Sequence, residues 1–116
     1  MARVLVVLSL LTLVSTAAAH GVLQRTDPRS GSTVKTAPQV RLEFTGAIEP
    51  AYSRVQVLDG EGRRVDLGDS RVDPDNRTLL RVSLPALPPG RYRVAWRVLS
   101  IDSHVTEGDF MFRVAR

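Results

Sequence analysis

The feature that most constrains the fold is a strict alternation of apolar and polar residues that recurs through much of the chain. The clearest run spans residues 91–98, where Tyr, Val, Trp and Val alternate with Arg, Arg, Ala and Arg. Shorter runs with the same period occupy residues 39–44, 55–57, 80–84 and 110–114. Because successive side chains of a β-strand point to opposite faces, each run predicts a strand with one buried and one solvated face.

Turn-forming residues separate these runs. Gly, Pro, Asp and Asn gather in residues 27–31, 59–62, 73–76 and 88–90, and no convincing amphipathic helix lies between them. Strands and turns at this spacing are typical of two packed sheets. We therefore expect an all-β domain, an antiparallel immunoglobulin-like β-sandwich of about seven strands.

The amino-terminal segment has the pattern of a secretory signal peptide. Arg3 provides a basic start, residues 4–14 are mostly apolar, and an A-x-A cleavage sequence ends at Ala19. The apolar stretch is well short of the roughly twenty residues that a membrane-spanning helix needs. We therefore expect residues 1–19 to be a signal peptide that is removed on export. Residues 20–116 are then expected to form one periplasmic or secreted domain with no membrane span.

Composition excludes several classes of site and partner. The chain has no cysteine, which rules out disulfides, thiolate zinc sites and iron–sulfur clusters. The formal net charge is +4, but the arginines are dispersed and often lie between apolar residues. Nucleic-acid binding would require a basic stripe with stacking aromatics. We therefore interpret the arginines as the solvated faces of strands and expect no nucleic-acid partner.

The only two histidines, His20 and His104, are placed where both can bind a metal. Cleavage after Ala19 makes His20 the first residue of the mature chain, so it offers its α-amino nitrogen as well as a ring nitrogen. His104 follows Asp102 by two positions, and in an extended segment two such side chains project to the same side. We therefore predict a metal site built from His20, Asp102 and His104.

The donor set of this site favours Cu(II). Three nitrogens and one carboxylate oxygen in a plane form the tetragonal site that suits Cu(II), whereas zinc prefers a tetrahedron. Cu(I) prefers soft sulfur ligands, and the mature chain contains only Met111 and no cysteine. We therefore expect one Cu(II) per chain.

The sequence resembles the CopC family of copper-resistance proteins along essentially the whole mature chain. The matching stretches are His20-Gly21-Val22-Leu23, Thr26-Asp27-Pro28 with Ser30-Gly31, residues 40–44, residues 48–53 and, most specifically, residues 89–104. The resemblance implies a small periplasmic or secreted cupredoxin-like β-sandwich that binds Cu(II) through His20, Asp102 and His104. It also implies copper delivery or sequestration in copper homeostasis and resistance, with a CopD-type inner-membrane protein as a candidate recipient.

Two departures from the family pattern concern the site. Ser103 stands where the family usually has glycine between the ligands, which restricts the turn without removing a donor. Gly46 stands where some relatives have a glutamate near the copper. Glu49 is close in sequence, and we interpret it either as a surface acid before Pro50 or as a carboxylate that supports the copper ligands. The methionine-rich Cu(I) segment of some relatives is absent.

Two other functions remain open for a domain of this kind. A metal-independent β-sandwich interaction module would keep its partner binding after both histidines were replaced. A histidine-brace copper redox enzyme would need an open copper position for oxygen, and Asp102 would fill that position. We therefore expect a copper carrier or sequestration protein, and no enzymatic activity.

Overall fold

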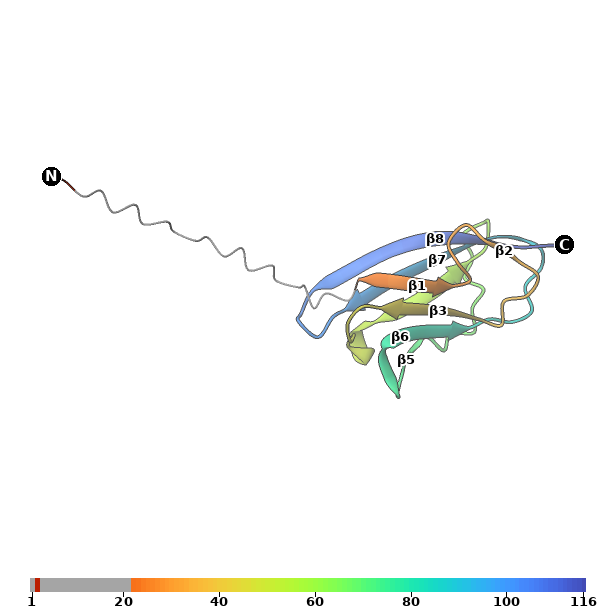
Figure 1. Ribbon diagram of the computed structural model, residues 1–116. Coiled ribbons are helices and arrows are strands. Elements are labelled where there is room, and N and C mark those ends of the chain that lie inside the picture. The colour runs from red at the N-terminus through yellow and green to blue at the C-terminus, as the bar shows by residue number, and fades with distance from the viewer. Residues whose placement is uncertain (1, 3–21) are drawn as a thin grey trace.

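The protein is a sandwich of two four-stranded β-sheets (Figure 1). The computed structural model describes Ala2 and residues 22–116. Apart from Ala2, the predicted signal peptide lies outside the described residues, and so does His20. Within the described part of the chain, no helix is long and apolar enough to cross a membrane.

Each sheet is built mainly from antiparallel neighbours. The first sheet has the order β1 (Leu23–Asp27), β3 (Gln39–Phe44), β6 (Asn76–Ser83), β5 (Arg71–Asp73). The second has the order β2 (Thr33–Val34), β8 (Val105–Val114), β7 (Gly90–Leu99), β4 (Arg54–Leu58). β2 pairs with β8 in parallel. The predicted all-β sandwich is confirmed, with eight strands in residues 22–116 where we expect about seven.

The core lies between the two sheets and consists of the residues that the alternation predicts to face inward. In β3, β6, β7 and β8 the core residues are Val40, Leu42, Phe44, Leu80, Val82, Tyr92, Val94, Val98, Phe110, Phe112 and Val114. Leu79 of β6 is also buried, although the alternation places it on the other face. Tyr92 stacks on Phe112 with ring centroids 5.6 Å apart, and its hydroxyl donates a hydrogen bond to the Pro88 carbonyl oxygen at 2.5 Å. Burial of one face per strand therefore fixes the strand register.

Trp96 is the one aromatic of β7 that is only partly buried, and a glycine makes room for it. Its ring meets Phe44 edge-on, with centroids 5.4 Å apart and an interplanar angle of 72°. Gly108 of β8 lies directly opposite Trp96 in the strand register, and the indole occupies the space where a Cβ atom of residue 108 would be. The β7–β8 hairpin therefore packs closely around this aromatic pair.

The β7–β8 hairpin ends in a turn at residues 100–104, which is anchored by the segment after β3. Ile48 forms a β-bridge with Ser100, and the Glu49 N–H donates to the Leu99 carbonyl oxygen at 2.7 Å. Pro50 then begins a short 3-10 helix, η1 (Pro50–Tyr52), because its fixed φ suits the first helical position. These contacts hold the turn at one end of the sandwich, next to the start of β1 (Figure 1).

Candidate metal centre

The segment that contains Asp102 and His104 is a tight turn. The Ser100 N–H donates to the His104 carbonyl oxygen and the Ser103 N–H donates to the Ser100 carbonyl oxygen, both at 2.9 Å. Ser103 has a φ of 70°, in the left-handed region that favours glycine. The expectation of an extended segment is therefore wrong, because the hairpin must reverse direction within these few residues.

The turn nevertheless brings the two predicted ligands together. The Nδ1 atom of His104 lies 3.2 Å from the Oδ2 atom of Asp102, and the His104 side chain is 61% exposed. A metal bound by both groups would take the place of the proton between them. Alternatively, it would bind Nε2 of the imidazole while the carboxylate orients the ring. The pair is therefore accessible and has the composition of part of a metal site.

Ser100 holds the Asp102 carboxylate in this arrangement. Ser100 is buried, with 1% of the residue exposed. The hydroxyl donates to the Oδ1 atom of Asp102 and lies 3.1 Å from the His104 carbonyl oxygen. The hydrogen bond from Ser100, together with weaker contributions from His104, lowers the pKa of Asp102 from 3.8 to about 2. Asp102 is therefore an anion at any pH near neutrality and offers a charged oxygen without losing a proton.

The described residues supply two of the three predicted ligands. Among residues 22–116, no group of three or more His, Cys, Asp or Glu side chains is arranged to hold a metal. The third predicted ligand, His20, lies outside the described residues. Its participation stays a prediction.

Sequence reasoning missed Ser100 as a functional residue, although the pattern contains a sign of it. Ser100 continues the series of even-numbered inward-facing residues of β7 beyond Val98. A serine at a position that the alternation predicts to be buried needs a polar partner. Here that partner is Asp102.

Glu49 behaves as a surface acid. Its Oε2 atom lies 3.7 Å from the Arg77 guanidinium, and 38% of its side chain is exposed. Its contact with the end of β7 is made by its backbone N–H, which donates to the Leu99 carbonyl oxygen, and not by its carboxylate. Of the two interpretations of Glu49, the geometry favours the surface acid before Pro50.

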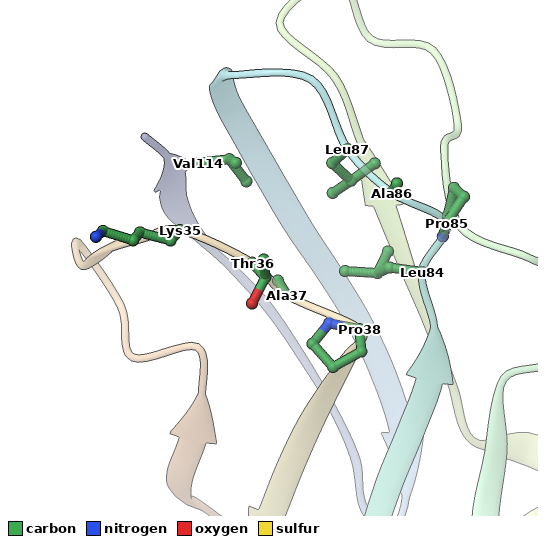
Figure 2. A pocket seen from close by; sticks show the side chains of 9 residues that line it. All are labelled: Lys35, Thr36, Ala37, Pro38, Leu84, Pro85, Ala86, Leu87 and Val114. Atoms are coloured by element: carbon green, nitrogen blue, oxygen red, sulfur yellow. The ribbon is translucent and has the colours of Figure 1, made fainter. Parts of the chain in front are cut away.

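An apolar hollow of about 310 Å³ at the opposite end of the sandwich is unsuited to a metal. It is lined by Lys35, Thr36, Ala37, Pro38, Leu84, Pro85, Ala86, Leu87 and Val114 (Figure 2). Lys35 is the only ionisable side chain among them, and it carries a positive charge. Val114 and the turn at residues 100–104 lie at opposite ends of β8, which are about 30 Å apart at the usual rise of a strand. The Asp102–His104 turn is therefore the candidate site.

Comparison with known proteins relates the chain to copper proteins. The family model of the CopC domain matches residues 23–115. Copper transport protein CutJ of Bacillus subtilis is 30% identical over 115 residues, which are 97% of this chain and 21% of CutJ. The chain thus spans about a fifth of the length of that relative. Protein YobA of Escherichia coli K12 is 31% identical over 98 residues, which are 83% of this chain and 79% of YobA.

Solved structures agree with this relationship. CopC from Methylosinus trichosporium OB3b is 34% identical, with a TM-score of 0.73, over 83% of this chain and 94% of that one. PcoC, a methionine-rich copper resistance protein from Escherichia coli, is 24% identical, with a TM-score of 0.69, over 82% of this chain and 98% of that one. The PcoC likeness establishes a common fold. The match of the family model to most of the chain establishes the family, and the chain belongs to the CopC domain family.

Proposed function

We propose that the protein binds one Cu(II) ion per chain outside the cytoplasm and carries or sequesters it in copper homeostasis and resistance. The proposed ligands are His20, Asp102 and His104. The observation that carries the proposal is the Asp102–His104 pair, in which His104 Nδ1 lies 3.2 Å from Asp102 Oδ2. The hydroxyl of the buried Ser100 donates a hydrogen bond to Asp102 and orients its carboxylate. The membership of the CopC domain family and the names of the copper relatives support it.

The chemistry of the pair suits Cu(II) as a cargo. Asp102 contributes a negative charge because its pKa is held at about 2. His104 adds an imidazole nitrogen that solvent reaches easily. His20, once it is the first residue, adds an α-amino and an imidazole nitrogen, which completes the tetragonal set that Cu(II) prefers. Binding rather than catalysis is the proposed role.

Export follows from the signal-peptide pattern of residues 1–19 and is part of the proposal. A CopD-type inner-membrane protein is the proposed recipient of the copper. CutJ, a copper transport protein nearly five times as long as the matched stretch, supports a link between domains of this type and copper transport. The location is therefore proposed to be periplasmic or secreted.

A Cu(II) competition titration of His104→Ala tests the site. Loss of a residue that merely supports a ligand costs about 10–100-fold in metal affinity, so loss of a direct ligand is expected to cost more than about 100-fold. Circular dichroism should be unchanged, because the His104 side chain is mostly exposed. An affinity within about threefold of the wild type would overturn the assignment of His104.

Two matched variants separate the site from general effects of charge and of the amino terminus. Asp109→Ala removes an exposed carboxylate that lies 3.7 Å from Arg93, and it should leave the Cu(II) affinity unchanged. A mature protein with one glycine added before His20 keeps the imidazole but moves the α-amino group, and it should bind Cu(II) much more weakly. Equal affinity of this extended protein would remove the amino-terminal chelate from the proposal.

A further inference from the structure

Exposed apolar side chains gather at the end of the sandwich that carries the Asp102–His104 turn. Five large hydrophobic residues of the described chain are exposed: Val22, Tyr52, Leu67, Ile101 and Val105. All but Leu67 lie at this end. Val22 precedes β1, Tyr52 ends η1, Ile101 is in the turn and Val105 begins β8 (Figure 1). A concentration of exposed apolar surface around one site is typical of an interaction surface.

Tyr52 and Val105 line a hollow beside the turn. The hollow has a volume of about 350 Å³, and its other lining residues include Leu99, Arg54 and Arg97. Tyr52 is 70% exposed. Apolar side chains and two arginines therefore line the same hollow.

The walls of this hollow are held in place by the backbone. The Tyr52 N–H donates to the Glu49 carbonyl oxygen at 3.1 Å. The Leu99 N–H donates to the Oγ atom of Ser53 at 3.2 Å, which ties the end of η1 to β7. A surface that is already ordered loses little conformational entropy when a partner binds. The backbone around the hollow is therefore already ordered for recognition.

The two arginines give the hollow a charge preference. Arg54 and Arg97 are directly opposite each other in the β4–β7 register, where their like charges repel. Glu107 lies 3.6 Å from Arg97. Arg54 has no ion pair within 4 Å with any other residue in the range 22–116. A carboxylate from a partner would therefore be attracted to this position.

We propose that the hollow formed by Tyr52, Leu99, Val105, Arg54 and Arg97 docks a copper-exchange partner protein. The segment that binds there carries an apolar or aromatic side chain next to carboxylates. This inference rests on the proposed function, because the hollow adjoins the proposed copper ligands. An anionic lipid surface shares the charge preference, but a concave hollow fits an inserted side chain better than a flat bilayer.

Two peptides with the same apolar centre test the proposal by NMR. The probes are Ac-Asp-Leu-Phe-Asp-NH2 and Ac-Lys-Leu-Phe-Lys-NH2, each titrated to millimolar concentration into the ¹⁵N-labelled protein. The acidic peptide should shift the amide signals of Tyr52, Arg54, Arg97 and Val105, and the basic peptide should not. Shifts at other residues, no shifts, or equal shifts with both peptides would overturn the proposal.

Two variants and one matched control make the test specific. Replacing both Arg54 and Arg97 by Gln should weaken binding of the acidic peptide about tenfold. Tyr52→Ser should weaken it by a similar factor, and it changes an exposed residue outside the core. The control replaces both Arg91 and Arg113 by Gln, since these arginines form a similar opposed pair at the far end of the same sheet. It should bind like the wild type. Equal losses in all three variants would contradict a defined docking hollow.

A copper titration and a lipid assay complete the test. Replacement of Arg54 and Arg97 should leave Cu(II) affinity unchanged. If the wild type binds copper but not the acidic peptide, only the docking inference fails; if it binds no copper, the proposed function fails whatever the peptides do. Binding to phosphatidylglycerol vesicles without peptide binding would replace the protein partner by a lipid surface.

Discussion

Gly108 is the position where the structure predicts the clearest response to a single added methyl group. A Cβ atom on residue 108 would lie 2.8 Å from the Cζ2 atom of Trp96 and 3.1 Å from its Cε2 atom. The indole cannot move freely, because it also packs edge-on against the buried ring of Phe44. Gly108→Ala should therefore force the indole or the backbone of the β7–β8 hairpin to move.

The magnitude follows from two opposing effects. An extra methyl group in a packed site costs about 1–3 kcal/mol. Replacing glycine by alanine raises the unfolding free energy by about 0.4–1 kcal/mol, because the unfolded chain becomes less flexible. From the middle of each range, the net loss of unfolding free energy is about 1.3 kcal/mol, which lowers the Tm by about 5–10 °C for a domain of this size.

Thermal and urea unfolding measure this loss, and the fluorescence of the single tryptophan reports the local change. Gly60→Ala is the matched control, because the nearest atom to its added Cβ, the Arg91 carbonyl oxygen, is 4.0 Å away. That variant should be as stable as the wild type or slightly more stable. If Gly108→Ala is no less stable than Gly60→Ala and leaves the Trp96 fluorescence unchanged, the packing argument is wrong.

Three further predictions concern the turn and the loop that precedes β5. Ser103→Gly should raise the unfolding free energy by up to about 1 kcal/mol, because glycine relieves the left-handed backbone at φ 70°; a less stable variant in urea unfolding would contradict this. Ser100→Ala should weaken Cu(II) binding in the competition titration by about 10–100-fold without abolishing it, because Asp102 loses the hydroxyl that orients it; unchanged affinity would remove this role. Asp69→Asn should lower the Tm at neutral pH, because hydrogen bonds from the Ser83 side chain and backbone lower the pKa of Asp69 from 3.8 to about 2. A carboxyl whose pKa is lowered on folding stabilises the protein above pH 3.8, and that stabilisation is lost as the pH falls towards 2. The Tm difference between Asp69→Asn and the wild type should therefore shrink over this range, and a constant difference would refute the linkage.

The long strands could be predicted from the sequence because burial alternates along them. Residues 91–98 predicted a half-buried strand, and β7 runs over Gly90–Leu99 with its even-numbered valines in the core. The short strands could not be predicted in this way. β2 has two residues and β5 has three, so neither shows a period. Each forms only because a longer neighbour provides an edge to pair with.

The candidate site was predicted in part, for a reason that the structure corrects. The spacing of Asp102 and His104 indicated that the two side chains meet, and they do, at 3.2 Å. They meet because Ser103 turns the chain, whereas the prediction assumed an extended segment. The hollow beside Tyr52 could not be predicted, because Arg54 and Arg97 become neighbours only through the pairing of β4 with β7.

In the proposed site, export creates an amino-terminal histidine that binds Cu(II) together with Asp102 and His104. The most direct measurement is the intact mass of the exported protein, recorded under native conditions with and without one equivalent of Cu(II). We predict a chain that begins at His20 and retains one copper ion. A chain that begins at another residue, or one that begins at His20 but retains no copper, would contradict this prediction.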